Sequence, residues 1–156
     1  MKKILLAILV FTVFIFSCKK DKEVTTPSSS TNCTSIIPNK LSAKISNVSW
    51  CADQSCFGDL GTIMTINGLN GNGSSLTLEL DDFMPGTYPI TLDRNHILYT
   101  EINAYESTNS LPGSLTITSN DTASNLLKGY FSVTLKSPIS GSVSISEGFI
   151  SLYYTE

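Results

Sequence analysis

The feature that most constrains the fold of this chain is an alternation of apolar and polar side chains. The segment Leu76-Thr-Leu78-Glu-Leu80 places every second side chain on one face, which is typical of a half-buried β-strand. The same period of two recurs around residues 41–45, 115–117 and 131–135. No stretch after Thr34 carries the 3.6-residue period of an amphipathic helix. The sequence therefore predicts an all-β domain.

Turn-forming residues separate these predicted strands at short intervals. They are Asn67-Gly68, Asn70-Gly-Asn-Gly73, Pro85-Gly86, Pro112-Gly113, Asn120-Asp121 and the segment from Pro138 to Gly141. We expect the turn at residues 70–73 to close a hairpin between strands at 62–66 and 76–80, and Gly148 to cause a bulge or bend in the last strand. Eight or nine short strands favour an antiparallel β-sandwich, with a closed or flattened β-barrel as the alternative.

The N-terminus has the order of an export signal. Lys2 and Lys3 precede an apolar run from Ile4 to Phe16 that ends at Ser17-Cys18. At about 1.5 Å of rise per residue, this run is shorter than the ~30 Å hydrocarbon core of a bilayer. It fits the apolar region of a secretory signal. We expect residues 1–17 to be a lipoprotein signal peptide, with an ordinary signal peptide or an uncleaved anchor as alternatives.

Cleavage at this point makes Cys18 the lipid-carrying first residue of the mature protein. The charged residues 19–23 and the Ser-, Thr- and Pro-rich stretch after them cannot bury enough apolar surface to offset the entropy of ordering. Residues 18–35 are therefore predicted to be the lipidated cysteine and a flexible tether. Residues 36–156 are long enough for one β domain with its own core.

Charge and the lipid anchor limit the partners of the mature chain. Without Lys2 and Lys3, eight basic side chains remain against thirteen acidic ones, a net charge of −5, and the folded part has no basic patch. We therefore expect no nucleic-acid partner. The expected partners are the membrane, through the lipid on Cys18, and a glycan or an envelope protein.

Three cysteines remain once Cys18 is acylated, so an exported chain can form one internal bridge among them. In the alternation that turns Val48, Trp50 and Ala52 toward the core, Cys51 points to the other face. A bridge from Cys33 to Cys51 would close a loop of about 18 residues and contribute roughly 3 kcal/mol. The alternative is a shorter loop from Cys51 to Cys56, and three free thiols form a third possibility.

Residues for catalysis or for a metal site are sparse. The single histidine, His96, lies near Asp93 without a second imidazole or a nucleophile elbow. Asp81 and Asp82 offer hard oxygen ligands, but no loop has EF-hand spacing, so turn capping explains these carboxylates better. We therefore expect no catalytic residue, no metal and no cofactor.

Aromatic side chains offer a binding hypothesis. Five tyrosines lie in or beside strands whose opposite faces already supply an aliphatic core, and outward-facing rings can stack on sugars or on a partner protein. They are Tyr99, Tyr105, Tyr130, Tyr153 and Tyr154. Cross-strand packing on a solvated sheet is the alternative. Trp50 and Phe131 are expected in the core.

Several short motifs follow the Ser17-Cys18-Lys-Lys-Asp21 start. They are Ala43-Lys44 leading to Trp50-Cys-Ala52, Gly86-Thr-Tyr88, Gly113-Ser-Leu-Thr-Ile117, Gly129-Tyr-Phe131 and Glu147-Gly-Phe149. With these motifs, residues 40–156 resemble a family of Bacteroidota envelope lipoproteins that is catalogued as a domain of unknown function. The resemblance implies a location and a fold, and no activity.

Two further motifs resemble Bacteroidota signals. Residues 19–23, Lys-Lys-Asp-Lys-Glu, are similar to the tract that sends some lipoproteins to the cell surface, although Lys22 interrupts the acids. A solvated start of the tether is the alternative reading. Asp121-Thr122-Ala123 is similar to the O-glycosylation pattern, so Thr122 is a candidate glycosylation site.

Together these patterns predict an outer-membrane-anchored lipoprotein with a non-catalytic β-sandwich binding or interaction module. Its domain would lie on the periplasmic or the surface-exposed face. A cell-envelope enzyme, with a site assembled from scattered polar residues, is the alternative.

Overall fold

The alternating side chains do form strands, and no helix occurs among residues 38–156, the part of the chain that the computed structural model describes. Eleven strands are present in this range, more than the eight or nine expected. The strands are β1 (Lys40–Ile45), β2 (Val48–Cys51), β3 (Ser55–Leu60), β4 (Met64–Leu69), β5 (Ser75–Leu80), β6 (Gly86–Ile90), β7 (His96–Thr100), β8 (Ala104–Glu106), β9 (Gly113–Asp121), β10 (Leu126–Ser137) and β11 (Gly141–Thr155).

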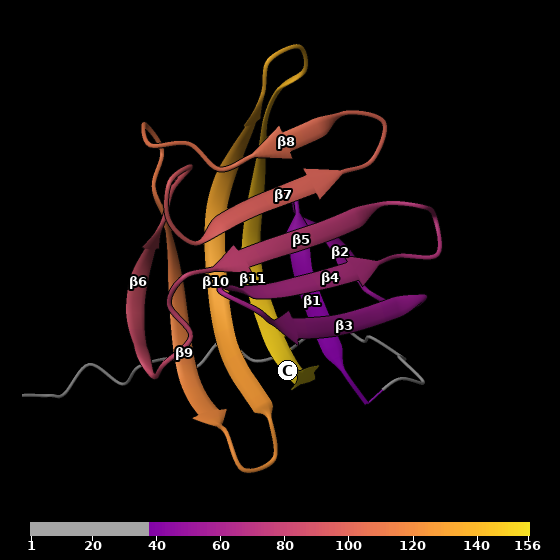
Figure 1. The fold of residues 1–156 in the computed structure, drawn as a ribbon. Helices are drawn as coiled ribbons and strands as arrows, with labels where there is room; N and C mark the ends of the chain where they lie inside the picture. Colours follow the sequence, from indigo (N-terminus) through magenta and orange to yellow (C-terminus); the bar gives the residue numbers. More distant parts are fainter. Residues whose placement is uncertain (1–37) are drawn as a thin grey trace, which may run out of the picture.

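One continuous sheet folds over on itself to make two layers. Its order is β2-β1-β11-β3-β4-β5-β7-β8-β10-β9-β6. In Figure 1 the strands β3, β4, β5, β7 and β8 form the front layer, and β1, β2, β6, β9, β10 and β11 lie behind them. The all-β sandwich predicted from the alternation is confirmed. Its strands are not all antiparallel, because β11 pairs with β3 in parallel through Tyr154 and Thr155.

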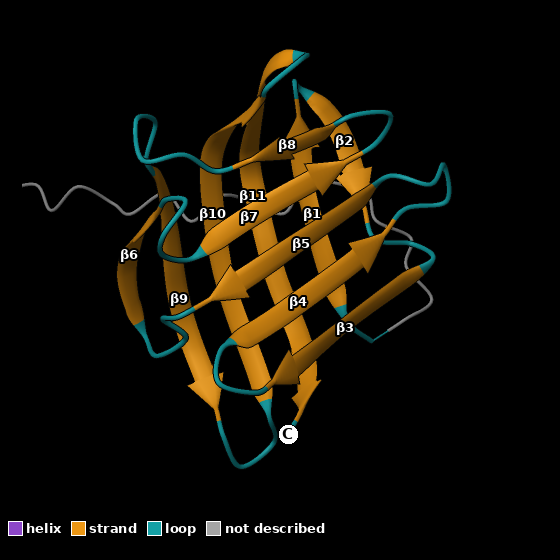
Figure 2. Cartoon of the chain, turned by 45° about the horizontal axis from the view of Figure 1, so that its top comes forward, coloured by secondary structure: helices purple, strands orange, loops and turns teal. Residues whose placement is uncertain are grey.

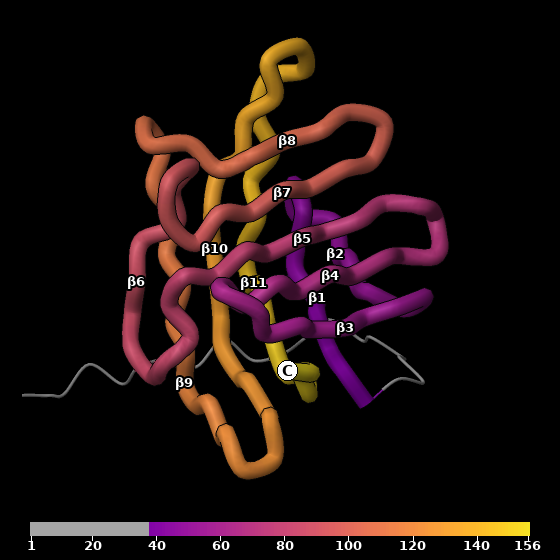
Figure 3. The backbone as a smooth tube through the Cα atoms, in the orientation of Figure 1, coloured from indigo at the N-terminus to yellow at the C-terminus, as the bar shows by residue number. Residues whose placement is uncertain are grey.

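Two long strands hold the layers together. β11 pairs with β1 and with β10, and its end also reaches β3 in the other layer. β10 pairs with β9 along its first half and meets β8 at Lys136. Figure 2 shows the front strands crossing over β10 and β11, and Figure 3 shows how the yellow C-terminal segment runs beside the indigo first strand. Each long strand therefore belongs to both layers at a corner of the sandwich.

The core lies between the layers and is built from the inward side chains of both. Trp50 and Phe131 are buried in it, as predicted from their positions. The largest fully buried side chains are Leu41, Met64, Ile66, Leu76, Leu78, Leu80, Ile90, Ile97, Leu115, Ile117, Leu127 and Leu135. At roughly 1.5–3 kcal/mol for each buried side chain of this size, this apolar set is the main source of stability.

The predicted irregularity at Gly148 is a β-bulge. Phe131 of β10 pairs with Gly148 and Val133 pairs with Ile145, so a single residue of β10 lies opposite two residues of β11. Glu147 has φ +50° at this point, and a Cβ on Gly148 would lie 2.5 Å from the Phe131 carbonyl oxygen. The extra residue reverses the alternation of β11. Ile145 before the bulge and Ile150 after it therefore both face the core.

The hairpin predicted around residues 70–73 joins β4 to β5. The Asn70 N–H donates to the Ser74 carbonyl at 2.8 Å, and Gly73 takes φ +90°, which suits glycine. Side chains reinforce the turn, because the Asn70 amide oxygen accepts from the Asn72 N–H and the Asn72 amide oxygen accepts from the Ser74 N–H.

The predicted signal peptide of residues 1–17, the predicted lipidation site Cys18, the predicted tether and Cys33 all lie outside the described residues. Within the described range, Cys51 is disulfide-bonded. Cys56 is a free, buried thiol, so the alternative bridge from Cys51 to Cys56 is not formed. Its side chain points into the core from β3, and burial raises the pKa of Cys56 to about 11. None of residues 38–156 supplies a helix with the length and apolarity to cross a bilayer.

Candidate ligand-binding site

The five tyrosines singled out as outward-facing have different surroundings. Tyr153 is half exposed, while Tyr105 and Tyr130 are partly buried. Tyr99 and Tyr154 are core residues at 5% and 4% exposure, so the prediction that they face outward is wrong. On β7 the inner face carries Ile97 and Tyr99, and on β11 the bulge turns Tyr154 inward.

Two of these tyrosines line a cavity at one end of the sandwich, which we call the end pocket. It has a volume of about 290 Å³ and lies where β5 begins and β7 ends. Its lining combines three aromatic rings with amides, hydroxyls, aliphatic side chains and one carboxylate. The lining residues are Ile45, Ser46, Val48, Ser49, Trp50, Asn70, Asn72, Tyr99, Glu101, Tyr105 and Val143. This mixture of apolar wall and a few polar groups is typical of small-molecule sites.

A chain of hydrogen bonds fixes Trp50 in the wall of the end pocket. The indole N–H donates to the Ser74 hydroxyl at 2.8 Å, and that hydroxyl donates to the amide oxygen of Asn72. The Asn70 side chain donates to the Cys51 carbonyl and so ties the β4–β5 turn to β2. Gly68 leaves the space that Trp50 occupies, because a Cβ there would lie 3.1 Å from the indole ring.

Tyr99 and Tyr105 pair across β7 and β8, with ring centroids 6.3 Å apart. The Tyr99 hydroxyl donates to Oε2 of Glu101 at 3.3 Å. Burial raises the pKa of Tyr99, a hydrogen bond from the Ser74 side chain opposes this, and the negative charge of Glu101 adds to it. The phenol therefore stays protonated at neutral pH, and Glu101 brings a carboxylate to the mouth of the pocket.

Val48 forms part of the rim of the end pocket. We expected its side chain in the core, in register with Trp50, but it is 70% exposed, so that prediction is wrong. β2 is an edge strand of the sheet, and Val48 is its first residue, directly after the Ser46-Asn47 turn. An exposed apolar side chain beside a cavity is a surface that a ligand can cover.

A second depression runs along the outer face of β9, β10 and β11. Two adjoining hollows of about 400 and 180 Å³ share Ser114 and Ser132 in their lining. The rings of Tyr130 and Phe149 lie at one end of it with centroids 5.5 Å apart. We call this the outer groove. It is shallower than the end pocket and lined largely by hydroxyl groups and backbone.

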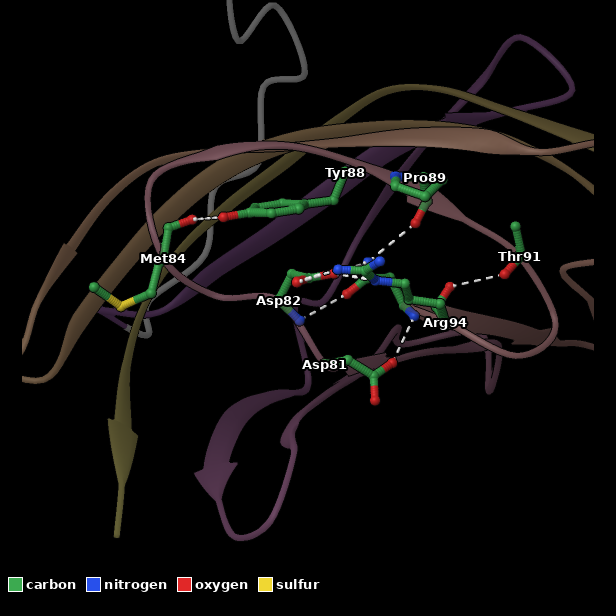
Figure 4. A network of polar contacts seen from close by, with 8 residues as sticks. Asp81, Asp82, Met84, Tyr88, Pro89, Thr91 and Arg94 are labelled. Atoms are coloured by element: carbon green, nitrogen blue, oxygen red, sulfur yellow. Dashed lines mark hydrogen bonds and ion pairs between the residues drawn. The ribbon is translucent and has the colours of Figure 1, made fainter.

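The opposite end of β5 and β7 carries a polar network (Figure 4). Arg94 donates to both oxygens of Asp82 at 2.6 and 2.8 Å, and Asp81 accepts from the Asn95 N–H. The buried Asn95 side chain donates to Asp82 and to the Pro89 carbonyl. Asp93 accepts from the Asn109 side chain. These carboxylates secure loops, as the turn-capping interpretation requires.

His96 lies on β7 between two carboxylates. Its Nδ1 is 3.6 Å from Glu79 and its Nε2 is 3.7 Å from Glu106. It lines neither the end pocket nor the outer groove. Among the described residues, no group of three or more His, Cys, Asp or Glu side chains is arranged to hold a metal ion.

Thr122 lies exposed in the turn between β9 and β10. Asp121 holds this turn by accepting from the Ala123 N–H and from the Ser124 hydroxyl. These two hydrogen bonds, the one from Ser124 first, lower the pKa of Asp121. The hydroxyl of Thr122 is thus presented on the surface of an ordered turn.

The sequence alone did not identify Trp50, Asn70, Asn72 and Glu101 as one site. Trp50 was assigned to the core and the asparagines to a turn. Both assignments are correct, but neither indicates that these residues line the same cavity. The cluster of aromatic and amide residues near strand ends was the available signal, but alternation cannot show which ends of the two layers meet.

Comparison with known proteins gives one match. Residues 39–152 match the family described as Domain of unknown function (DUF6252). No curated protein and no solved structure shows significant similarity to the chain.

Proposed function

We propose that this chain, which belongs to the DUF6252 family, is an outer-membrane-anchored lipoprotein whose β-sandwich is a non-catalytic binding module. The anchoring rests on the sequence of residues 1–18, with its two lysines, apolar run and cysteine. The resemblance to Bacteroidota envelope lipoproteins supports the same location, on the periplasmic or the surface-exposed face.

The end pocket is the observation that carries the binding role. It brings three aromatic rings from separate strands and the carboxylate of Glu101, in the β7–β8 turn, into a single cavity, with the exposed Val48 on its rim. Trp50 and Tyr99 are held in place by hydrogen bonds before any ligand arrives, which reduces the entropy lost on binding. The expected ligand is a small molecule, or a protruding group of a glycan or an envelope protein, that fits into such a cavity.

Binding is tested by capture from intact cells. The lipidated wild-type protein is compared with Tyr105→Leu, which removes a ring from the end pocket, and with Tyr153→Leu, which removes an exposed ring elsewhere on β11. A glycan array is probed in parallel. Ligand retention by wild type and Tyr153→Leu but not by Tyr105→Leu supports the proposal. Equal retention by all three places binding elsewhere and contradicts it.

The anchor is tested separately with Cys18→Ala. The substitution should block cleavage and acylation, so that no lipidated mature protein forms. Two or more acyl chains hold a protein on a bilayer far more stably than one, at about 0.8 kcal/mol per buried CH₂ group. A Cys18→Ala protein of mature size that still fractionates with membranes would contradict the lipoprotein assignment.

Mass spectrometry of the native protein tests the predicted O-glycosylation of Thr122, and recovery of only the unmodified peptide counts against it.

A further inference from the structure

The end pocket has an uneven charge. Of the described residues that line it, Glu101 is the only one with a formal charge, and no Lys, Arg or His is among them. The carboxylate lies at the mouth, where Tyr99 occupies its Oε2. Oε1 accepts no hydrogen bond from the described residues and faces no opposing charge in this lining. A ligand with a positive charge is therefore favoured over a neutral or anionic one.

The aromatic rings favour the same charge. Trp50, Tyr99 and Tyr105 approach the cavity from three strands, β2, β7 and β8. The N–H of Trp50 and the O–H of Tyr99 are already used, by Ser74 and by Glu101. Trp50 and Tyr99 therefore offer the ligand their π-systems rather than their polar atoms. Ring faces attract a cation within about 6 Å, and more strongly when it is desolvated.

The amide oxygens in the lining of the end pocket are already used by the protein. Both polar atoms of the Asn70 side chain are used, since the nitrogen donates to Cys51 and the oxygen accepts from Asn72. The amide oxygen of Asn72 accepts from Ser74 twice. The amide oxygens of both asparagines are therefore engaged within the β4–β5 turn.

From these contacts we propose that the end pocket binds a small organic cation, a methylated ammonium group, with Glu101 as its counter-ion and the rings of Trp50, Tyr99 and Tyr105 around it. The inference rests on the proposed binding function and names the ligand class for that pocket. The volume of about 290 Å³ suits such a group, and Ile45, Val48 and Val143 supply apolar contacts for its methyl groups.

Trp50 supplies the readout, because it is the only tryptophan in the chain. The lipidated full-length protein, in a neutral polyoxyethylene detergent, is titrated with choline and with 3,3-dimethylbutan-1-ol, which has the same shape without the charge. Choline should change the Trp50 emission and bind about tenfold tighter than the alcohol. Equal binding of the two probes, or no response to choline, overturns the proposal.

Substitutions test whether Glu101 is the counter-ion of the bound cation. Glu101→Gln keeps the size of the side chain and should weaken choline binding about tenfold, while its binding of the neutral alcohol should be unchanged. Glu106→Gln is the matched control, because Glu106 lies on neighbouring β8 and does not line the end pocket. Unchanged choline affinity in Glu101→Gln contradicts the assignment.

Two further titrations are informative. One identifies the source of the cation, and the other tests the proposed binding function independently of the ligand class. Phosphocholine represents a headgroup, and choline represents a free cation, so their relative affinities identify the source while either one supports the site. Methyl α-glucoside tests the neutral alternative. One outcome would keep the binding site but reject the ligand class. In it, the glucoside shifts the Trp50 emission, Tyr105→Leu abolishes that shift, and choline causes no shift.

Discussion

The two ends of strands β5 and β7 differ in how their polar side chains are used. Where β5 ends and β7 begins, the loops are tied by Asp81, Asp82, Arg94 and Asn95, whose polar atoms bond to one another and to the backbone. Where β5 begins and β7 ends, Trp50 and Tyr99 are held, but Glu101 and Tyr105 face a cavity. The first end uses its polar groups for stability, whereas the second leaves Glu101 and Tyr105 facing the cavity in which we propose that a ligand binds.

Asn95→Ala should have the largest effect, because it removes a buried side chain with three hydrogen bonds at a residue with φ +52°. We expect the free energy of unfolding to fall by about 3 kcal/mol, as the Pro89 carbonyl and the Asp82 N–H lose their partner. Urea denaturation measures it. Asn72→Ala, in the turn beside the end pocket, is the matched change and should cost about 1 kcal/mol. Equal losses would remove the contrast between the two ends.

Gly68→Ala tests the rigid part of the pocket end. The added Cβ would lie 2.8 Å from both Ala52 and Leu41, so the core must shift, at a cost of about 2 kcal/mol. Because the indole ring of Trp50 is the third neighbour, its emission should change as well. In Gly73→Ala the new Cβ meets nothing within 4 Å, and strain at φ +90° should cost about 1 kcal/mol with unchanged Trp50 emission. Identical spectra for the two variants would contradict this.

Acid should weaken the networked end. The hydrogen bond from Arg94, with a smaller contribution from Asn95, holds the pKa of Asp82 below its usual value against the effect of burial. Because this pKa is lower in the folded chain than in the unfolded one, the stabilisation is present above the unfolded value, about 3.9, and is lost as pH falls through the folded value. Urea midpoints measured downward from pH 7 should therefore decline less in Asp82→Asn than in wild type. If the urea midpoints of Asp82→Asn and wild type fell in parallel with pH, Asp82 would not be the cause of the acid sensitivity. The control Asn72→Ala should show the same pH dependence of the midpoint as wild type.

Glu101→Gln should have the smallest effect on stability. The side chain is exposed and takes part in one hydrogen bond, at 3.3 Å, so the free energy of unfolding should change by less than about 0.5 kcal/mol. A thermal melt beside the choline titration separates the two roles. A large loss of stability would mean that Glu101 is a structural residue and that the contrast between the ends is false.

The sequence predicted those features that depend on near neighbours. The β4–β5 hairpin follows from Asn and Gly in its turn, the bulge follows from Gly148, and Trp50 lies in the core as its alternation with Ala52 indicates. Tyr99 was misplaced because Ile97, Leu98 and Tyr99 are consecutive apolar residues. Alternation alone does not say which of two faces is inner in such a run.

The end pocket depends on a different kind of information. Its rings come from β2, β7 and β8, and they meet only because the two layers cross and share corners at β10 and β11. The local periodicity of the sequence does not indicate how the two layers cross. The number of strands was underestimated for a related reason, since a strand as short as β8, with three residues, cannot establish a period.

The pairings of β11 have a consequence for the order in which the domain can be made. This strand follows all the other described strands in the sequence, yet β1, β3 and β10 all require it as a neighbour. Contacts so distant in sequence form late, after the cost of closing long loops has been met. A nascent chain that lacks residues 141–156 has no edge on which to join its first strand to the rest. The two layers therefore cannot close until residues 141–156 are available.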